Sequence, residues 1–296
     1  MLKYTKHPTF SLPSPRDILR IAGTGIVASL CMGQMAAAEI QLTFGTYTAD
    51  KPTQTVQKFK PFLDYLSEKL SDQLQEPVKI KMQISGKYEQ GIDELVNGTV
   101  DFSRFGPASY VSAKDRNTDI EIIAMESQNG KKTFKGIIAV HEDSDIQTLA
   151  DLADRSFAFG DPLSTIGRYL AQSELIEAGI FEADLSDHAF LGRHDRVGTA
   201  VGKKDYDAGA LKSSTFKKLQ DKNVPIRKLV DFDNVTKPWI VRSDMDPRIV
   251  EAMRVVMLSA TDKDVLKTVS KSGFIEGSDA DYDDIRSAIA KSATFN

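Results

Sequence analysis

The sequence predicts an α/β protein with two lobes, a hinge and a cleft between the lobes. Short apolar strand patterns alternate with longer amphipathic helix patterns, which is typical of α/β proteins with a mostly parallel sheet. The alternation occurs in two successive blocks, and a helical tail follows the second block. The composition, 41% hydrophobic and 27% charged over 296 residues, is that of a globular chain long enough for one large or two medium domains.

The first 38 residues have a different character and are predicted to be a secretory signal peptide. Four basic residues precede an apolar run over residues 21–32. Ala36 and Ala38 then place small side chains at the positions that a signal peptidase reads, which predicts cleavage before Glu39. A membrane anchor is the alternative, but the apolar run is too short to span a bilayer comfortably. We therefore expect an exported protein.

The first block opens with a strand over 40–45, in which polar and apolar residues alternate. A long helix follows Pro52, because apolar residues from Val56 to Leu74 recur every three or four positions, and Pro77 ends it. The remaining elements of this block are strands over 78–82, 100–103 and 120–125 and helices that begin near Tyr88 and Pro107.

The second block runs from Phe134 to about residue 230 with the same alternation. An extended segment over 230–241 and a helical tail from Pro247 follow it. This tail is a natural cover for the first lobe, so we expect lobe 1 to be discontinuous. Two chain crossings between the lobes would then form a hinge. The expected division is residues 1–38 for the signal peptide, 39–130 with 234–296 for lobe 1, and 131–233 for lobe 2.

The mature composition argues against several functional classes. Cys31 lies in the predicted signal peptide, so the mature chain has no thiol for a disulfide, a zinc site or a nucleophile. Removing residues 1–38 takes away four basic side chains and one acidic one, which leaves 34 basic and 41 acidic residues and a net charge of −7. Such a chain is a poor candidate for binding nucleic acid or an anionic membrane. Since the sequence also lacks metal-ligand spacings and nucleotide loops, we expect no cofactor and no metal.

The segment Gly160–Arg168 is the most informative for function. It follows the apolar strand pattern Phe157–Phe159 and precedes an amphipathic helical run. Pro162 and Ser164 are turn and cap residues, so Ser164 or Thr165 should lie in the first turn of a helix. The unpaired N–H groups and the dipole at a helix start favour a phosphate-like or carboxylate group. The alternative is an ordinary capped helix after a strand.

Five segments, in order along the chain, carry a family resemblance. They are residues 41–47 (QLTFGTY), 62–66 (FLDYL), 100–110 (VDFSRFGPASY), 160–165 (GDPLST), and 192–195 (GRHD) with 206–210 (YDAGA) after it. Together they resemble the phosphonate, phosphite and phosphate substrate-binding proteins of ABC transporters, of the PhnD type. The resemblance covers nearly all of the mature chain and implies a type II periplasmic binding fold. It also implies two lobes that close on a small anion and deliver it to a membrane permease.

The resemblance further implies residues that hold the anion. The Ser-Thr-Ser helix start of phosphonate binders corresponds to Ser164, Thr165 and Ile166, so one hydroxyl is lost while the backbone N–H of Ile166 remains. A cleft tyrosine of the family corresponds to Tyr88, and the family histidine corresponds to His194. Either side chain can donate a hydrogen bond to an anion oxygen.

Other positions depart from the family pattern. A crossover tyrosine is replaced by Phe134, and the two carboxylates that hold the amino group of aminophosphonates correspond to Ser214 and Lys237. A ligand ammonium would find no charge partner there, so we expect poor binding of aminoalkylphosphonates. Tyr47 and Tyr110 are also counted among the ligand-binding candidates, with core packing as their alternative role.

The combined expectation is a monomeric periplasmic solute-binding protein that captures a small phosphorus oxyanion or phosphonate for an ABC permease. A ligand-sensing subunit for a membrane receptor or histidine kinase is the alternative, and an enzyme on the same fold is less favoured. Whether Arg168, Arg193 and Trp239 contact the ligand stays open at this point.

Overall fold

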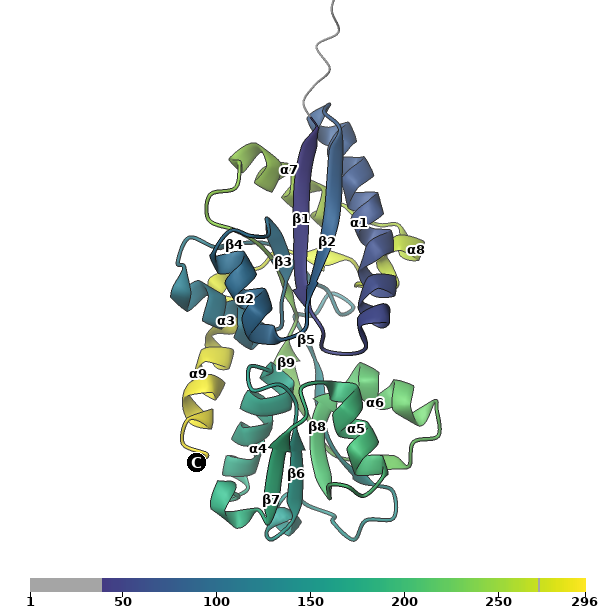
Figure 1. Ribbon diagram of the computed structural model, residues 1–296, viewed down its shortest axis with the longest axis vertical. Coiled ribbons are helices and arrows are strands. Elements are labelled where there is room, and N and C mark those ends of the chain that lie inside the picture. The colour runs from purple at the N-terminus through teal and green to yellow at the C-terminus, as the bar shows by residue number, and fades with distance from the viewer. Residues whose placement is uncertain (1–38, 271) are drawn as a thin grey trace, which may run out of the picture. The chain divides into compact units, whose positions relative to one another are not determined.

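Two β-sheets organise the protein in the computed structural model, which describes residues 39–270 and 272–296 (Figure 1). The predicted signal peptide lies outside the described residues. Among the residues that the structure does describe, no helix is both long and apolar enough to cross a membrane.

The first sheet has six strands in the order β11-β4-β10-β3-β1-β2. β1 runs parallel to both β2 and β3, whereas β10 and β11 run antiparallel to their neighbours. The carboxyl ends of β1 and β3 therefore lie at the same edge of the sheet. The strands are β1 (Ile40–Tyr47), β2 (Val78–Ser85), β3 (Phe102–Arg104), β4 (Glu121–Glu126), β10 (Pro238–Val241) and β11 (Phe274–Ile275).

Helices cover both faces of this sheet, and successive strand residues point into two different cores. Trp239 packs with Phe44 and Phe62 beneath α1 and α7, whereas the next residue, Ile240, belongs to the core beneath α2 and α3. Pro residues begin α1, α3 and α7, where a missing N–H costs nothing. Val56, predicted on the apolar face of α1, is 41% exposed. The helices are α1 (Pro52–Leu74), α2 (Tyr88–Val96), α3 (Pro107–Arg116), α7 (Pro247–Leu258) and α8 (Lys263–Leu266).

The second sheet has five strands in the order β7-β6-β8-β5-β9, with β6 parallel to both β7 and β8. One face is covered by η3, a π-helical turn that continues into α4, and the other face by α5 and α6. The strands are β5 (Thr133–His141), β6 (Ser156–Phe159), β7 (Asp187–Phe190), β8 (Ala208–Lys212) and β9 (Ile226–Val235). The helices are η3 (Thr165–Leu170), α4 (Ala171–Glu177), α5 (His194–Gly202) and α6 (Ser213–Gln220), with single turns η2 (Ala150–Leu152) and η4 (Glu182–Asp184). The turn η5 (Asp279–Tyr282) instead packs on α3 beside the first sheet.

The chain passes between the sheets at residues 127–132 and 236–237. The extended segment predicted over 230–241 is therefore two strands of different sheets. Pro238 can begin β10 because the first residue of a strand need not donate a ladder hydrogen bond. The predicted division into two lobes remains a prediction, although the strands between residues 39 and 126 all lie in the first sheet.

The end of the chain contacts elements of both sheets. α9 (Asp283–Ser292) packs on α3 and also on η3 and α4 (Figure 1). Phe295, only 1% exposed, enters the core beneath α4 together with Phe159. The backbone N–H of Glu182 donates to the carbonyl of Phe295 at 2.9 Å. The tail thus covers more than the first sheet, because its last residues supply apolar surface to the second.

Candidate functional site

A small cavity of about 50 Å³ lies where strand ends of the two sheets meet the starts of η3 and α5. Tyr47 is the last residue of β1, Arg104 the last of β3 and Lys212 the last of β8. In open α/β sheets, ligands bind at the carboxyl ends of the strands, so this is the expected edge. The lining residues are Tyr47, Ala49, Tyr88, Arg104, Gly106, Pro107, Phe134, Ser164, Thr165, Ile166, His194, Lys212, Asn234 and Lys237.

The turn before η3 brings its first residues to the cavity. Gly160 and Gly167 approach so closely that a Cβ on Gly167 would lie 2.7 Å from the Cα of Gly160. The backbone N–H of Gly160 donates to the carbonyl of Gly167 at 2.7 Å, which fixes the strand against the helix start. Ser164 caps the helix as predicted, and its carbonyl accepts from the N–H groups of Arg168 and Tyr169. The second of these bonds spans five residues, the π-helical spacing that recurs at functional sites.

The side-chain hydroxyls of Ser164 and Thr165 accept hydrogen bonds from backbone N–H groups and can still act as donors. Ser164 Oγ accepts from the N–H of Gly167 at 2.9 Å, and Thr165 Oγ1 accepts from the N–H of Ala108 at 2.8 Å. Each hydroxyl therefore has its own O–H to donate, and that of Ser164 also interacts with the Tyr88 hydroxyl. The N–H groups of Thr165 and Ile166 belong to the first turn, where no intrahelical acceptor exists. This geometry offers several donors to an anion in the cavity.

Two stacked tyrosines form one wall. The rings of Tyr47 and Tyr88 lie 3.8 Å apart between centroids. The Tyr47 hydroxyl accepts from the N–H of Gly106 and donates to Ser109 Oγ, both at 2.7 Å. Its O–H proton is therefore already engaged by a neighbour on α3. Burial raises the pKa of Tyr47 to about 12 and that of Tyr88 well above 10, so both stay protonated. Tyr47 thus shapes the wall, while Tyr88 carries a protonated hydroxyl at the cavity.

His194 begins α5 and is 5% exposed. Its backbone N–H donates to the carbonyl of Ala49 at 3.2 Å, which joins α5 to the loop after β1. Burial, with a further contribution from the charge of Lys212, lowers the pKa of His194 to about 3. The imidazole is therefore neutral at physiological pH. Its Nδ1 atom has no hydrogen-bond partner among the described residues.

Positive charge exceeds negative charge around the cavity. Arg104 makes two hydrogen bonds to Glu126, with Nε–Oε1 at 2.6 Å and Nη2–Oε2 at 2.9 Å. Burial opposes ionisation of Glu126, but the guanidinium prevails and lowers the pKa of Glu126 to about 2. Lys212 pairs with Asp50. Lys237 Nζ instead lies 3.6 Å from the centroid of the Phe134 ring.

Two of the predicted ligand residues do not line the cavity. The Tyr110 hydroxyl donates to Asp279 at 2.7 Å, because this side of α3 faces the segment before α9. Ser214 lies in the first turn of α6 with its side chain exposed. The other eight predicted residues, Tyr47, Tyr88, Phe134, Ser164, Thr165, Ile166, His194 and Lys237, all line it.

The structure also shows where the three residues lie whose contact with the ligand the sequence left undecided. Trp239 is fully buried in the core beneath α1. Arg168 donates to the carbonyl of Pro162 at 2.9 Å and lies over the ring of Tyr169. Arg193 pairs with Asp195. None of the three lines the cavity.

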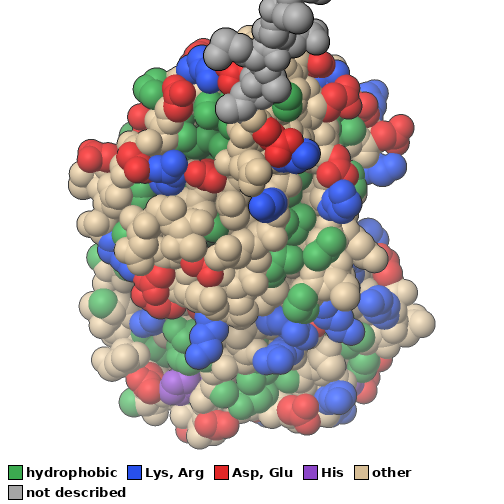
Figure 2. Space-filling model, turned by 45° about the horizontal axis from the view of Figure 1, so that its top comes forward, with side chains coloured by type: hydrophobic (Ala, Val, Ile, Leu, Met, Phe, Trp, Pro, Cys, Tyr) green, Lys and Arg blue, Asp and Glu red, His purple; other side chains and the backbone are tan. Residues whose placement is uncertain are grey.

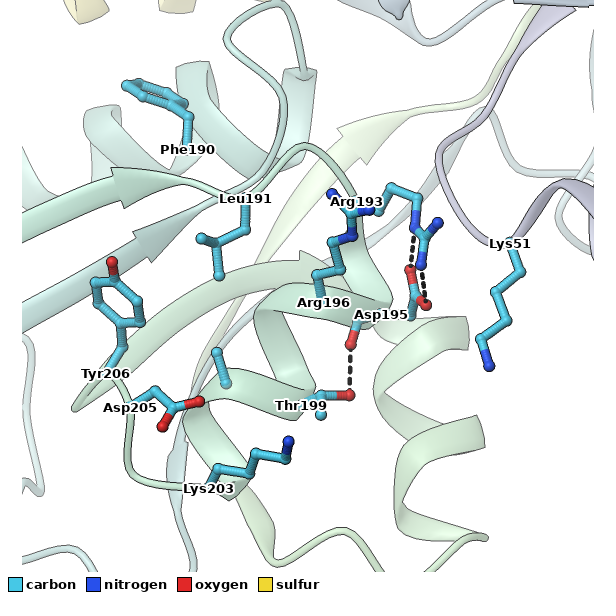
Figure 3. Close-up of a pocket in the computed structure, with 11 residues that line it drawn as sticks. Lys51, Phe190, Leu191, Arg193, Asp195, Arg196, Thr199, Lys203, Asp205 and Tyr206 are labelled. Carbon is cyan, nitrogen blue, oxygen red and sulfur yellow. Dashed lines mark hydrogen bonds and ion pairs between the residues drawn. The ribbon is translucent and has the colours of Figure 1, made fainter. Parts of the chain in front are cut away.

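A second, larger hollow of about 630 Å³ lies over α5 and shares no lining residue with the cavity (Figure 3). Its basic residues are partly matched by acids, as in the pair of Arg193 with Asp195 drawn there. Arg196 and Lys203 are exposed to solvent. Figure 2 likewise shows acidic and basic side chains interspersed over one face, with several Lys and Arg side chains in its lower half.

Three polar lining residues escaped the sequence interpretation: Arg104, Lys212 and Asn234. The first two end strands that pair in parallel with β1 and β6, and this position is a recognisable signal. Asn234, whose Oδ1 atom is buried without a partner among the described residues, has no comparable signal because β9 ends at a crossing between the sheets.

Two curated proteins are similar to this chain in sequence over most of its length. The chain is 25% identical over 305 residues to the phosphate-import protein PhnD of Mycolicibacterium smegmatis, covering 90% of this chain and 92% of that protein. It is 25% identical over 259 residues to a probable ABC transporter phosphite binding protein, PhnD1, of Prochlorococcus marinus, covering 79% and 85%.

Solved structures agree with the fold. PhnD1 of Prochlorococcus marinus in complex with methylphosphonate has a TM-score of 0.75 at 22% identity, over 85% of this chain and 97% of that one. A binding protein component of an ABC phosphonate transporter from Pseudomonas aeruginosa has a TM-score of 0.73 at 18% identity, over 86% of each chain. These matches confirm the predicted α/β fold of periplasmic binding proteins.

The family relationship rests on the sequence itself. A family model described as "ABC transporter, phosphonate, periplasmic substrate-binding protein" matches residues 44–282. This span contains every residue that lines the cavity. The chain therefore belongs to the family of periplasmic substrate-binding proteins of phosphonate ABC transporters.

Proposed function

We propose that this protein captures a small phosphorus oxyanion or phosphonate in the periplasm and delivers it to an ABC permease. The observation that carries the proposal is the cavity at the start of η3, where the hydroxyls of Ser164 and Thr165 keep free donors beside an excess of cations. The names of the relatives, a phosphate importer and a probable phosphite binder, support the same ligand class.

The size of the cavity supports a small ligand. A buried water needs about 10–15 Å³ of such space, so a cavity of about 50 Å³ holds roughly four water-sized groups. A tetrahedral oxyanion has about that many peripheral groups. Long alkyl or nucleotide tails would need the cavity to widen.

The proposed mechanism follows from the donors. The anion accepts hydrogen bonds from the hydroxyls and N–H groups of residues 164–166, and Tyr88 and the neutral His194 complete its surroundings. We propose that lobe 1 (39–130 with 234–296) and lobe 2 (131–233) separate to admit the ligand and close on it. Closure removes water and strengthens each bond. Micromolar affinity requires only about −8 kcal/mol, which a few charge-assisted bonds can supply.

The cavity disfavours a ligand ammonium group. None of the described residues that line it is an Asp or a Glu, whereas Arg104, Lys212 and Lys237 are cations. An ammonium buried there would lack a partner and face like charges. We therefore propose that aminoalkylphosphonates bind poorly compared with phosphate, phosphite or methylphosphonate.

The proposal also covers the oligomeric state of the protein, its lack of catalytic activity and its location. The protein acts as a monomeric binding protein rather than an enzyme, so the ligand should be recovered chemically unchanged after incubation. The family it belongs to is periplasmic, and the predicted signal peptide over residues 1–38 supports export.

Titration calorimetry with phosphate, phosphite, methylphosphonate and 2-aminoethylphosphonate tests the proposal. The double variant Ser164→Ala with Thr165→Ala should lose about a hundredfold or more in affinity, since each hydrogen bond to a charged group contributes about 1.5–3 kcal/mol. Ser259→Ala, an exposed hydroxyl at the end of α7, is the matched control. Unchanged affinity of the double variant, or tight binding of 2-aminoethylphosphonate, would contradict the proposed site.

A further inference from the structure

The charged groups around the cavity do not balance. Four cations, Arg104, Lys212, Lys237 and Lys58, influence one another there, against the carboxylates of Glu126 and Asp50. Arg104 is paired with Glu126, and Lys212 with Asp50. No carboxylate within the described part of the chain lies at salt-bridge distance from Lys237 or from Lys58. Lys237 and Lys58 are thus the two basic groups left for an anionic ligand to pair with.

Lys237 is the unpaired cation that lines the cavity itself. It occupies the short connection between β9 and β10, and its carbonyl accepts from the N–H of Glu126 at 3.0 Å. The neighbouring Thr236 donates its N–H to the carbonyl of Lys132 at 2.7 Å. The side chain therefore extends from a fixed backbone, and its ammonium rests on the Phe134 ring. A ring face holds a cation in place while leaving its N–H groups free for an anion.

We propose, on the basis of the proposed function, that Lys237 makes this site select dianionic tetrahedral oxyanions over monoanionic ones of the same shape. The favoured class comprises alkylphosphonates, phosphite and hydrogen phosphate. The disfavoured class comprises alkylsulfonates, which carry a single negative charge at any pH near neutrality. The number of hydrogen bonds at Ser164 and Thr165 cannot make this distinction, because an alkylphosphonate and an alkylsulfonate both present three oxygens.

The electrostatics of the surroundings support this role. Lys237 is approached by Arg104 from β3, Glu126 from β4, Lys58 from α1 and Lys212 from β8. Burial and then the charge of Arg104 lower the pKa of Lys237 well below 10.5, and burial lowers that of Lys58 to about 7. His194 is neutral and contributes no charge. A bound dianion would favour the charged form of both lysines, so its binding should be accompanied by proton uptake.

A comparison of methylphosphonate with methanesulfonate tests the assignment, because the two differ in charge but hardly in size. Calorimetry is performed above the second ionisation of the phosphonate on the wild type, Lys237→Met and Lys135→Met. Lys135 is 48% exposed on β5 and serves as the matched control. Lys237→Met keeps the length of the side chain and should weaken methylphosphonate about a hundredfold, as expected for one partner of a buried charge pair. Methanesulfonate carries half the charge and should lose about half as much binding free energy, or about tenfold in affinity, so the discrimination should fall about tenfold.

The outcomes separate this inference from the proposed function. If the wild type binds methylphosphonate but Lys237→Met weakens both anions equally, the selectivity role of Lys237 is overturned and the anion site stands. If the wild type binds neither probe, and binds neither phosphate nor phosphite, the proposed function and this inference both fall. Lys237→Gln, with its thermal unfolding measured in parallel, repeats the test in a second variant. Calorimetry in two buffers of different ionisation enthalpy must show proton uptake by the wild type that is smaller in Lys237→Met.

Discussion

Replacing Lys58 with Met should stabilise the ligand-free protein, the opposite of what most substitutions in a packed region do. Lys58 extends from α1, with Nζ 5.0 Å from the centroid of the Phe59 ring, towards the cations Arg104 and Lys212. Burial, with these neighbouring charges, lowers the pKa of Lys58 from 10.5 to about 7. Met keeps the apolar stem and removes the ammonium.

The magnitude follows from the pKa. At about 1.4 kcal/mol for each pKa unit, the change from 10.5 to about 7 corresponds to about 5 kcal/mol of destabilisation. The side chain is only half-buried, so solvent reduces this value, and we expect Lys58→Met to gain about 3 kcal/mol at neutral pH. The folded pKa is lower than the unfolded one, so the penalty is full below pH 7 and disappears as the pH rises to 10.5. The gain should therefore shrink steadily over that range.

Urea unfolding in phosphate-free buffer measures the effect, with the fluorescence of the single, fully buried Trp239 as the signal. Lys60→Met, on the same helix and 63% exposed, is the control and should change stability by less than about 1 kcal/mol. A gain that does not depend on pH, or a loss of stability in Lys58→Met, would refute the reasoning.

Two further predictions concern the turn before η3 and the response to acid. Gly167→Ala should destabilise the protein by about 1–3 kcal/mol and abolish high-affinity anion binding, because its Cβ would lie 2.7 Å from the Cα of Gly160. Gly86→Ala, where a Cβ meets nothing within 4 Å, is its control, and equal effects in both variants would argue against a special turn. Acid should destabilise the fold because the pKa of His194, about 3, and that of Glu126, about 2, both lie below their unfolded values, so the unfolded chain binds protons first. Stability should fall from about pH 6.5 downwards, by about 3 kcal/mol at about pH 4, and a flat profile of urea midpoints over that range would contradict the buried environment of both groups.

Local patterns in the sequence predicted most elements of the fold. The helix from Pro52, the strand from Ile40 and the Ser164 cap are all determined by neighbouring residues, through periodicity or turn chemistry. The segment 230–241 is extended as predicted, but its division into β9 and β10 depends on which sheet each half joins. Pairing between distant strands decides that, and no local pattern reports it.

The sequence predicted some of the residues that line the cavity and missed others. Ser164 and Lys237 could be found because each aligns with a family position. Arg104 and Lys212 reach the cavity through the parallel pairing of β1 with β3 and of β6 with β8, and such contacts join residues about fifty positions apart or more. Tyr110 was included by its motif, but a motif does not tell which way a helical side chain points, and here it points to Asp279.

The placement of α9 has a mechanical consequence. Two chain crossings alone would leave the two sheets free to bend and to twist about the crossings. α9 adds a third attachment, since Phe295 and Ser292 bind to the η3–α4 side while Tyr282 and Ile285 pack with α3. A body held at three places moves with fewer degrees of freedom than one held at two, so the proposed opening of the lobes should follow a narrow path. Because α9 packs directly on η3, the helix whose first turn lines the cavity, the C-terminus should move whenever that turn moves.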